Sequence, residues 1–420
     1  MGRKSRLFLG TAAILAAINL GGCAGKGQQG SVGQSRAGAY QEPEARLLTY
    51  TFENPEADTF AYNALNDGEK LWYQDINSAL SHMETDRELS GEGLKAGLSE
   101  EDVDRIFQCV LMDHPEYFYV EGYTYTKYTR LERPIRLEIS GCYSCFLEEA
   151  IEKQRQIEEG AEKFLKEIPK EASDYEKIKG IYEAIILHTE YDQEAPDNQN
   201  LYSVLAGGRS VCQGYAKAFQ YLLNRLGIPC TTVFGEVFSG EGHAWNLVKA
   251  DGEYYYVDPT WGDTSYQAED GAETLNPPDI NYEYLCVSTD QLLKTHVLNS
   301  VVPLPECTHM EDNYYVREGA YITSDAEQAL ETFFANAEAK QQKTVALKCA
   351  SEEIYHALKE KLIEEQKIFE YLPSFGGRMA YTANEGQLSL TFWEAQSEQC
   401  YSSHAYSWGQ ISCSHENLPA

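Results

Sequence analysis

The sequence predicts an α+β fold in which a helix that begins at a cysteine packs against an antiparallel sheet. Apolar residues recur at three-and-four spacing in long segments before residue 227, the period of a buried helix face. Beyond residue 230 the period changes to two, and short apolar segments alternate with glycine-rich turns. Cys212 stands where the last of these helices, expected at about residues 212–226, begins. These observations predict a helix layer followed by a sheet layer.

The N-terminus resembles a bacterial lipoprotein signal. Three basic residues precede an apolar run at 7–20 that is too short to span a membrane, and Leu-Gly-Gly leads into Cys23. The resemblance implies cleavage before Cys23 and a lipid on its thiol, so we expect an exported protein on the outer face of the bacterial cytoplasmic membrane. The alternative is an ordinary secretory signal cut nearby. Residues 23–46, rich in Gly, Gln and Ser, predict a flexible tether after the signal at 1–22.

The chain is strongly acidic. Its formal charge of −32 becomes −35 once the three basic residues of the signal are removed. Nucleic-acid binding requires a basic surface, so we expect no nucleic-acid partner. The expected membrane contact is the lipid on Cys23.

The rest of the chain is long enough for several domains. A mainly helical region is expected first, with an aromatic strand pair at 117–129, followed by the cysteine-bearing core. Near the C-terminus the pattern predicts a small α+β domain: a helix capped by Ser324 and Glu327, a strand at 344–350, a helix at 352–365 and a hairpin around 384–387. The predicted boundaries are 47–145 for the helical region, 146–302 for the core, 303–396 for the small domain and 397–420 for a tail.

The other ten of the eleven cysteines give no clear framework. Apart from Cys23, we expect mostly buried free thiols. Cys142 and Cys145 form a CxxC, but the strand-turn-helix context of a redox site is missing. The spacing of Cys400, His404, Cys413 and His415 matches no standard zinc pattern. We expect no metal and no cofactor.

The predicted core contains a cysteine, a histidine and an aspartate, in this order along the chain, which together can perform thiol chemistry. A helix N-terminus favours the thiolate of Cys212, although a cysteine there can also simply pack in the core. His243 and Asp258 flank Asp251-Gly252, a strong signal for a two-residue hairpin turn. With the turn centred there, paired residue numbers sum to 503, which makes His243 and Asp258 diagonal neighbours on one face. A thiolate, an imidazole and a carboxylate are the three components of a thiol acyl-transfer triad.

The blocks VCQGYAKAF, HAWNLV and YYYVDPTWGD resemble the transglutaminase-like superfamily over about residues 175–261. This resemblance implies a papain-like α+β core with Cys212 as nucleophile, His243 as general acid and base, and Asp258 as the orienting carboxylate. It also implies that four residues of the strand and loop blocks line or brace the site: Trp245, Asn246, Pro259 and Trp261. Gly214 and Tyr215 match the start of the catalytic helix.

The sequence departs from the related families at the oxyanion hole. Papain-type enzymes carry a glutamine six residues before the nucleophile, where this chain has Ala206, and crosslinking transglutaminases use an upstream tryptophan that is absent between Trp72 and Trp245. The backbone N–H of Cys212 can supply one donor, and we expect Tyr202 or Gln213 to supply the second. The missing tryptophan weakens the case for amine transfer and favours hydrolysis.

The predicted function is therefore a surface-anchored cysteine peptidase or amidase that attacks peptide or isopeptide bonds in proteins or cell-wall peptides. One alternative is a crosslinking or amine-transferring transglutaminase. The other is a non-catalytic binding or scaffold module at the cell surface, in which the triad residues serve only packing.

Overall fold

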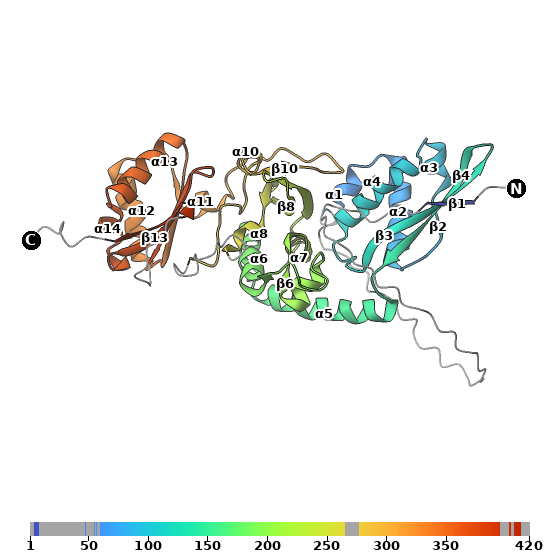
Figure 1. Cartoon of the computed structure of the whole chain (residues 1–420), viewed down its shortest axis with the longest axis horizontal. Helices are drawn as coiled ribbons and strands as arrows, with labels where there is room; N and C mark the ends of the chain where they lie inside the picture. The colour runs from blue at the N-terminus through green and yellow to red at the C-terminus, as the bar shows by residue number, and fades with distance from the viewer. Residues whose placement is uncertain are drawn as a thin grey trace, which may run out of the picture.

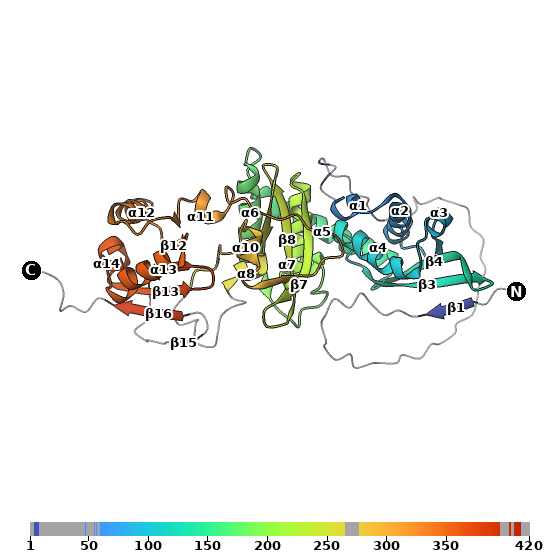
Figure 2. The same ribbon diagram turned by 90° about the horizontal axis from the view of Figure 1, so that it is seen from above.

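The computed structural model describes residues 4–7, 47, 54, 56, 59–264, 277–394, 403–404 and 407–412, with side chains outside 4–7 and 403–412. Three units follow one another along the long axis of the molecule, in chain order (Figures 1 and 2). The predicted lipid site at Cys23, the tether, and Cys400, Cys413 and His415 of the tail lie outside the described residues. None of the described helices is long and apolar enough to cross a membrane.

The N-terminal unit packs helices on a sheet of order β1-β3-β4-β2. Helices α2 and α4 begin with capping boxes at Asn66 and Ser99. The segment predicted as a strand pair at 117–129 is instead mostly one strand, β3, whose partner β4 follows it. Leu131 and Glu132 make the turn at positive φ without the glycine or asparagine that marks such turns in a sequence. The elements are β1 (Lys4–Leu7), α1 (Phe60–Asn63), α2 (Asp67–Ser81), β2 (Arg87–Glu88), α3 (Gly91–Lys95), α4 (Glu100–Asp113), β3 (Val120–Arg130) and β4 (Arg133–Tyr143).

The central unit packs helix α7 against an antiparallel sheet of order β10-β7-β8-β9. Its core is continuous with that of the N-terminal unit, because Phe107 of α4 and Phe219 of α7 belong to one buried cluster. The elements are α5 (Leu147–Lys166), α6 (Asp174–His188), β5 (Glu190–Tyr191), the π-helix η1 (Ser203–Gly207), β6 (Arg209–Ser210), α7 (Cys212–Arg225), β7 (Cys230–Val237), β8 (Gly242–Ala250), β9 (Glu253–Val257), α8 (Pro259–Gly262), α10 (Thr289–Leu292), β10 (His296–Leu298) and α11 (Tyr314–Arg317).

The hairpin β8–β9 has the predicted register. Its pairs run from Ala250↔Glu253 to Asn246↔Val257, and every pair sums to 503. Asp251 and Gly252 form the turn at φ of 50° and 92°. The prediction from the Asp-Gly signal is confirmed, and Asp258 is the first residue beyond the paired ladder.

The C-terminal unit has its own core and a sheet of order β11-β12-β14-β13-β16-β15. The predicted hairpin is confirmed by the pair Asn384↔Ser389, whereas α12 begins after Ala326, not Ser324. β16 pairs with β13, so the sheet continues beyond the boundary expected at 396. The elements are β11 (Tyr321–Ile322), α12 (Glu327–Ala339), β12 (Thr344–Cys349), α13 (Glu352–Lys359), the π-helix η3 (Glu360–Glu364), α14 (Ile368–Tyr371), the 3-10 helix η4 (Pro373–Phe375), β13 (Arg378–Asn384), β14 (Ser389–Glu394), β15 (Ser403–His404) and β16 (Ser407–Ser412).

All eight cysteines with described side chains are free thiols, and five of these are buried. This agrees with the expectation of mostly buried free thiols. Cys142 and Cys145 are both partly exposed and unbridged.

Candidate active site

Helix α7 begins at Cys212 without a side-chain cap. The preceding residue, Val211, is extended, with φ −116° and ψ 179°, and its apolar side chain accepts no hydrogen bond. The first-turn N–H groups therefore have no side-chain acceptor at the N-cap, and they carry the positive end of the helix dipole. The Cys212 thiol is partly exposed at this position. An electropositive, accessible helix start is the environment that makes a thiol reactive.

Gly214 allows the first turn of α7 to press against the preceding loop. A Cβ at Gly214 would lie 1.9 Å from Ser210 Oγ and 2.9 Å from the Asn198 carbonyl oxygen. Ser210 is itself fixed, since its hydroxyl contacts Ser203 Oγ at 2.6 Å and donates to the Asn198 carbonyl at 2.9 Å. The glycine of the CQGY block is therefore a packing requirement that fixes where Cys212 stands.

Two buried amides hold α7 to the sheet. Asn246 Nδ2 of β8 donates to the Ala216 carbonyl at 2.9 Å. Gln220 accepts from Thr232 of β7 and donates to the Met112 carbonyl at 2.8 Å. Asn246, which the resemblance places around the site, is fully buried and braces the helix against the strand.

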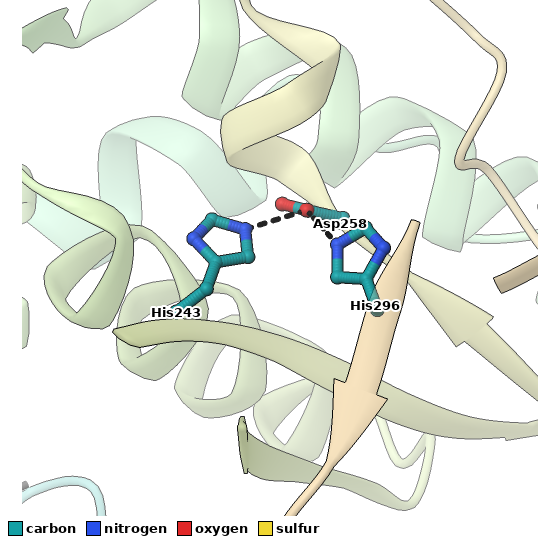
Figure 3. Close-up of side chains that lie close together, drawn as sticks. All are labelled: His243, Asp258 and His296. Carbon is teal, nitrogen blue, oxygen red and sulfur yellow. Dashed lines mark hydrogen bonds and ion pairs between the residues drawn. The ribbon is translucent and has the colours of Figure 1, made fainter. Parts of the chain in front are cut away.

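His243 of β8 joins the thiol to the carboxylate. Its Nε2 donates to Asp258 Oδ2 at 2.7 Å (Figure 3). The Cys212 thiol lies close enough to the same ring to act on its pKa. Burial lowers the pKa of His243, but Asp258 and Cys212 outweigh burial and raise it to about 10. Burial likewise opposes ionisation of Asp258, yet His243 and His296 hold the pKa of that carboxyl well below its usual range. This electrostatic pattern favours the imidazolium form of His243 beside the Asp258 carboxylate.

Every hydrogen-bonding direction of the Asp258 carboxylate is used. Oδ1 accepts from the backbone N–H groups of Thr260 at 3.0 Å and Trp261 at 3.1 Å, which caps α8. Oδ2 accepts from His243 and, at 3.2 Å, from His296 Nε2. The carboxylate is fully buried. Its orientation is thus fixed by the backbone on one oxygen and by two imidazoles on the other.

The sequence reasoning missed His296. This histidine lies in β10, which pairs with β7 through His296↔Val237, and it is 1% exposed. No local motif marks it, because the pairing of β10 with β7 brings it to Asp258, 38 residues earlier in the chain.

His243, Asp258 and His296 are also the one group of described side chains able to hold a metal ion, with ligand atoms within 4.8 Å of one another. Each Nε2 already has the carboxylate as hydrogen-bond partner, so hydrogen bonding accounts for the arrangement.

Two tryptophans enclose the imidazole. Trp245 stacks on His243 with ring centroids 5.8 Å apart and a 26° interplanar angle, and Trp261 lies at 6.0 Å. The indole Nε1 atoms of both are buried without a hydrogen-bond partner among the described residues. The rings cover the His243–Asp258 pair and keep its surroundings apolar.

The two residues expected as alternatives for the second oxyanion donor, Gln213 and Tyr202, differ in their surroundings. Gln213 follows Cys212 and is partly exposed. The hydroxyl of Tyr202 donates to Gln156 Oε1 of α5 at 2.6 Å, and its ring stacks on Phe118. Tyr202 would have to give up this bond to reach an oxyanion. The second donor stays a prediction.

Comparison with known proteins gives the family of the central unit. Residues 162–259 match the family model of the transglutaminase-like superfamily. This segment is a transglutaminase-like domain. The match and the helix-on-sheet architecture confirm the predicted α+β fold with a transglutaminase-like, papain-like core.

Two curated relatives share this domain. The kyphoscoliosis peptidase of Mus musculus is 32% identical over 123 residues, covering 25% of this chain and 19% of the relative. The Homo sapiens protein of the same name is 32% identical over 120 residues, covering 24% and 18%. The chain thus spans about a fifth of the length of these relatives. A crystal structure described as a TGase shares 19% identity over 34% of this chain and 44% of its own, with a TM-score of 0.25. The family match and the peptidase-named relatives support an enzyme of the cysteine type.

Proposed function

We propose that this protein is a thiol acyl-transfer enzyme in which Cys212 attacks an amide carbonyl, with hydrolysis as the usual outcome. One observation carries the proposal: the imidazole of His243 bonds the Asp258 carboxylate through Nε2 and lies beside the Cys212 thiol. This is the arrangement that a nucleophile, its acid-base partner and an orienting group require.

The geometry supports a two-step reaction. Cys212 Sγ forms a bond to the carbonyl carbon, the C–N bond breaks, and His243 Nδ1 gives its proton to the departing amine. Water then attacks the thioester, His243 takes a proton from that water, and the acid leaves as the thiolate is restored. The backbone N–H of Cys212 stabilises the oxyanion in both steps. Asp258 holds the ring in the required tautomer and stabilises the imidazolium.

The substrate class follows from the expected location. A lipid on Cys23 would hold the enzyme at the outer face of the cytoplasmic membrane. Peptide and isopeptide bonds of proteins or cell-wall peptides are within reach there. The peptidase name of the curated relatives supports cleavage over crosslinking. Incorporation of labelled palmitate into the full chain, lost in Cys23→Ser, tests the anchor.

The activity is tested with the mature chain bearing Cys23→Ser and a diverse peptide library. Cleavage products that disappear in Cys212→Ala support the hydrolase. Incorporation of a fluorescent primary amine into a glutamine-bearing protein, without cleavage, would favour the transferase. If Cys212→Ala left every measured activity and all cell-surface binding unchanged, the scaffold alternative would replace both.

A further inference from the structure

A row of hydrogen bonds leads from the catalytic carboxylate into the C-terminal unit. His296, bonded to Asp258, contacts Thr295 Oγ1 through Nδ1 at 2.8 Å, and Thr295 Oγ1 lies 2.9 Å from the Tyr284 hydroxyl. Gln387 Nε2, in the β13–β14 turn, donates to that hydroxyl at 3.2 Å. Lys348 Nζ of β12 donates to Gln387 Oε1 at 3.1 Å. Apart from half-buried Thr295, every side chain in this row is at most 3% exposed.

Each group in this row can donate its hydrogen bond to the next group in the direction of Asp258. With the His296 proton on Nε2, donated to Asp258, Nδ1 is an acceptor, and the single Thr295 hydroxyl proton fills it. The approach of Thr295 to the Leu292 carbonyl, at 3.4 Å, is longer. Thr295 then accepts from Tyr284, which accepts from the Gln387 amide, whose oxygen accepts from Lys348. Hydrogen bonds aligned in one direction polarise one another, and a low-dielectric interior strengthens the effect.

The far end of the row is a buried cation. The ionisable groups that act on the Lys348 ammonium are Glu283, Lys294 and Cys349, and the Tyr315 ring lies 5.8 Å away. Burial lowers the pKa of Lys348 to about 8, so it remains mostly charged at neutral pH. Glu283 in turn accepts from Asn384 and Ser389 of the C-terminal sheet. The interface between the two units is therefore polar and specifically paired at the point where the row crosses it.

We infer that Tyr284 and Gln387 are positioning residues, through which the C-terminal unit fixes the tautomer of His296 and thereby the orientation of the Asp258 carboxylate. This inference rests on the proposed function, since the carboxylate matters only if His243 activates Cys212. An intact row of hydrogen bonds keeps His296 as a donor to Asp258. A broken row frees Thr295 to turn its proton elsewhere and loosens that support.

The test is the rate of Cys212 alkylation by iodoacetamide at pH 6 in the mature chain bearing Cys23→Ser. Tyr284→Phe removes one hydroxyl. Gln387→Glu keeps the acceptor for Lys348 but removes the donor to Tyr284 and to the Gln291 carbonyl. We expect each to slow alkylation roughly threefold to tenfold, as for groups coupled within one network, and to move the midpoint of labelling to higher pH by about half a unit or more. Tyr355→Phe is the matched control, because the Tyr355 hydroxyl is buried without a hydrogen-bond partner among the described residues.

A structural role alone would lower thermal stability without moving the labelling midpoint. Wild-type rates and midpoints in both folded variants would overturn the inference. Failure of the proposed function gives a different result: wild-type Cys212 would react as an ordinary thiol with or without His243, and both proposals would fall.

Discussion

Helices α6 and α7 are neighbours of similar length that begin in opposite ways. α6 has a capping box, in which Ser173 Oγ accepts from the Glu176 N–H at 3.3 Å and the Glu176 carboxylate accepts from the Ser173 N–H at 2.8 Å. α7 has Val211 at its N-cap and no capping side chain. The first helix uses its N–H groups for stability, whereas the second keeps them beside the Cys212 thiol.

The difference shows where the stability of α7 comes from. A side-chain cap contributes about 1 kcal/mol, and α7 lacks it. Its flank is instead anchored by Asn246 and Gln220, and its first turn by the close packing of Gly214. A catalytic helix can therefore leave its end uncapped because its sides are held.

The largest expected effect comes from changing the carboxylate beside α7. Asp258→Asn has a single amide oxygen, and with that oxygen on the backbone N–H groups of Thr260 and Trp261 the amide NH2 faces both imidazoles, which lose their acceptor. We expect Cys212 alkylation at pH 6 to fall about a hundredfold, towards that of an ordinary thiol. Asp263→Asn is the matched control, because Asp263 bonds the Tyr215 hydroxyl of α7 but not the imidazole. Unchanged alkylation in Asp258→Asn would remove Asp258 from the site.

The pH dependence of stability tests the charge state at the site. Folding raises the pKa of His243 from 6.5 to about 10, so the native state holds a proton that the unfolded state releases. Its contribution is complete below pH 6.5 and is lost as pH rises through 10. The free energy of unfolding, measured in urea, should fall between pH 7 and pH 10 more steeply for wild type than for His243→Gln. Parallel pH curves would contradict the assigned imidazolium.

A comparison of two glycine-to-alanine substitutions tests the packing of the first turn of α7. Gly214→Ala forces a Cβ into Ser210 Oγ, so we expect a loss of about 1–3 kcal/mol in the free energy of unfolding, together with slower alkylation. Gly207→Ala meets nothing within 4 Å and should have neither effect. Equal stabilities of the two variants would show that the loop yields.

The smallest effects are expected from adding an N-cap side chain to α7 and removing the one of α6. Val211→Thr offers α7 a capping hydroxyl that competes with the thiolate for the same N–H groups, so we expect alkylation at pH 6 to slow about twofold to threefold. Ser173→Ala removes the cap of α6 and should cost about 1 kcal/mol of stability without changing alkylation. Equal effects of the two substitutions on Cys212 alkylation would mean that the two helix starts have the same role.

The sequence predicts those parts of the site that local chemistry specifies. The Asp251-Gly252 turn fixes the β8–β9 register, and with it the approach of Asp258 to His243. His296 could not be predicted, because the pairing of β10 with β7 depends on the tertiary fold. The β3–β4 turn could not be predicted either, because Leu131 and Glu132 adopt positive φ without a turn-forming sequence.

The central claim is that His243 activates Cys212, and the pH dependence of Cys212 alkylation tests it most directly. We expect rapid labelling of wild-type Cys212 well below the usual thiol pKa of about 8.5, and loss of that low-pH reactivity in His243→Ala. Labelling of Cys212 as an ordinary thiol in both proteins would mean that His243 does not activate it.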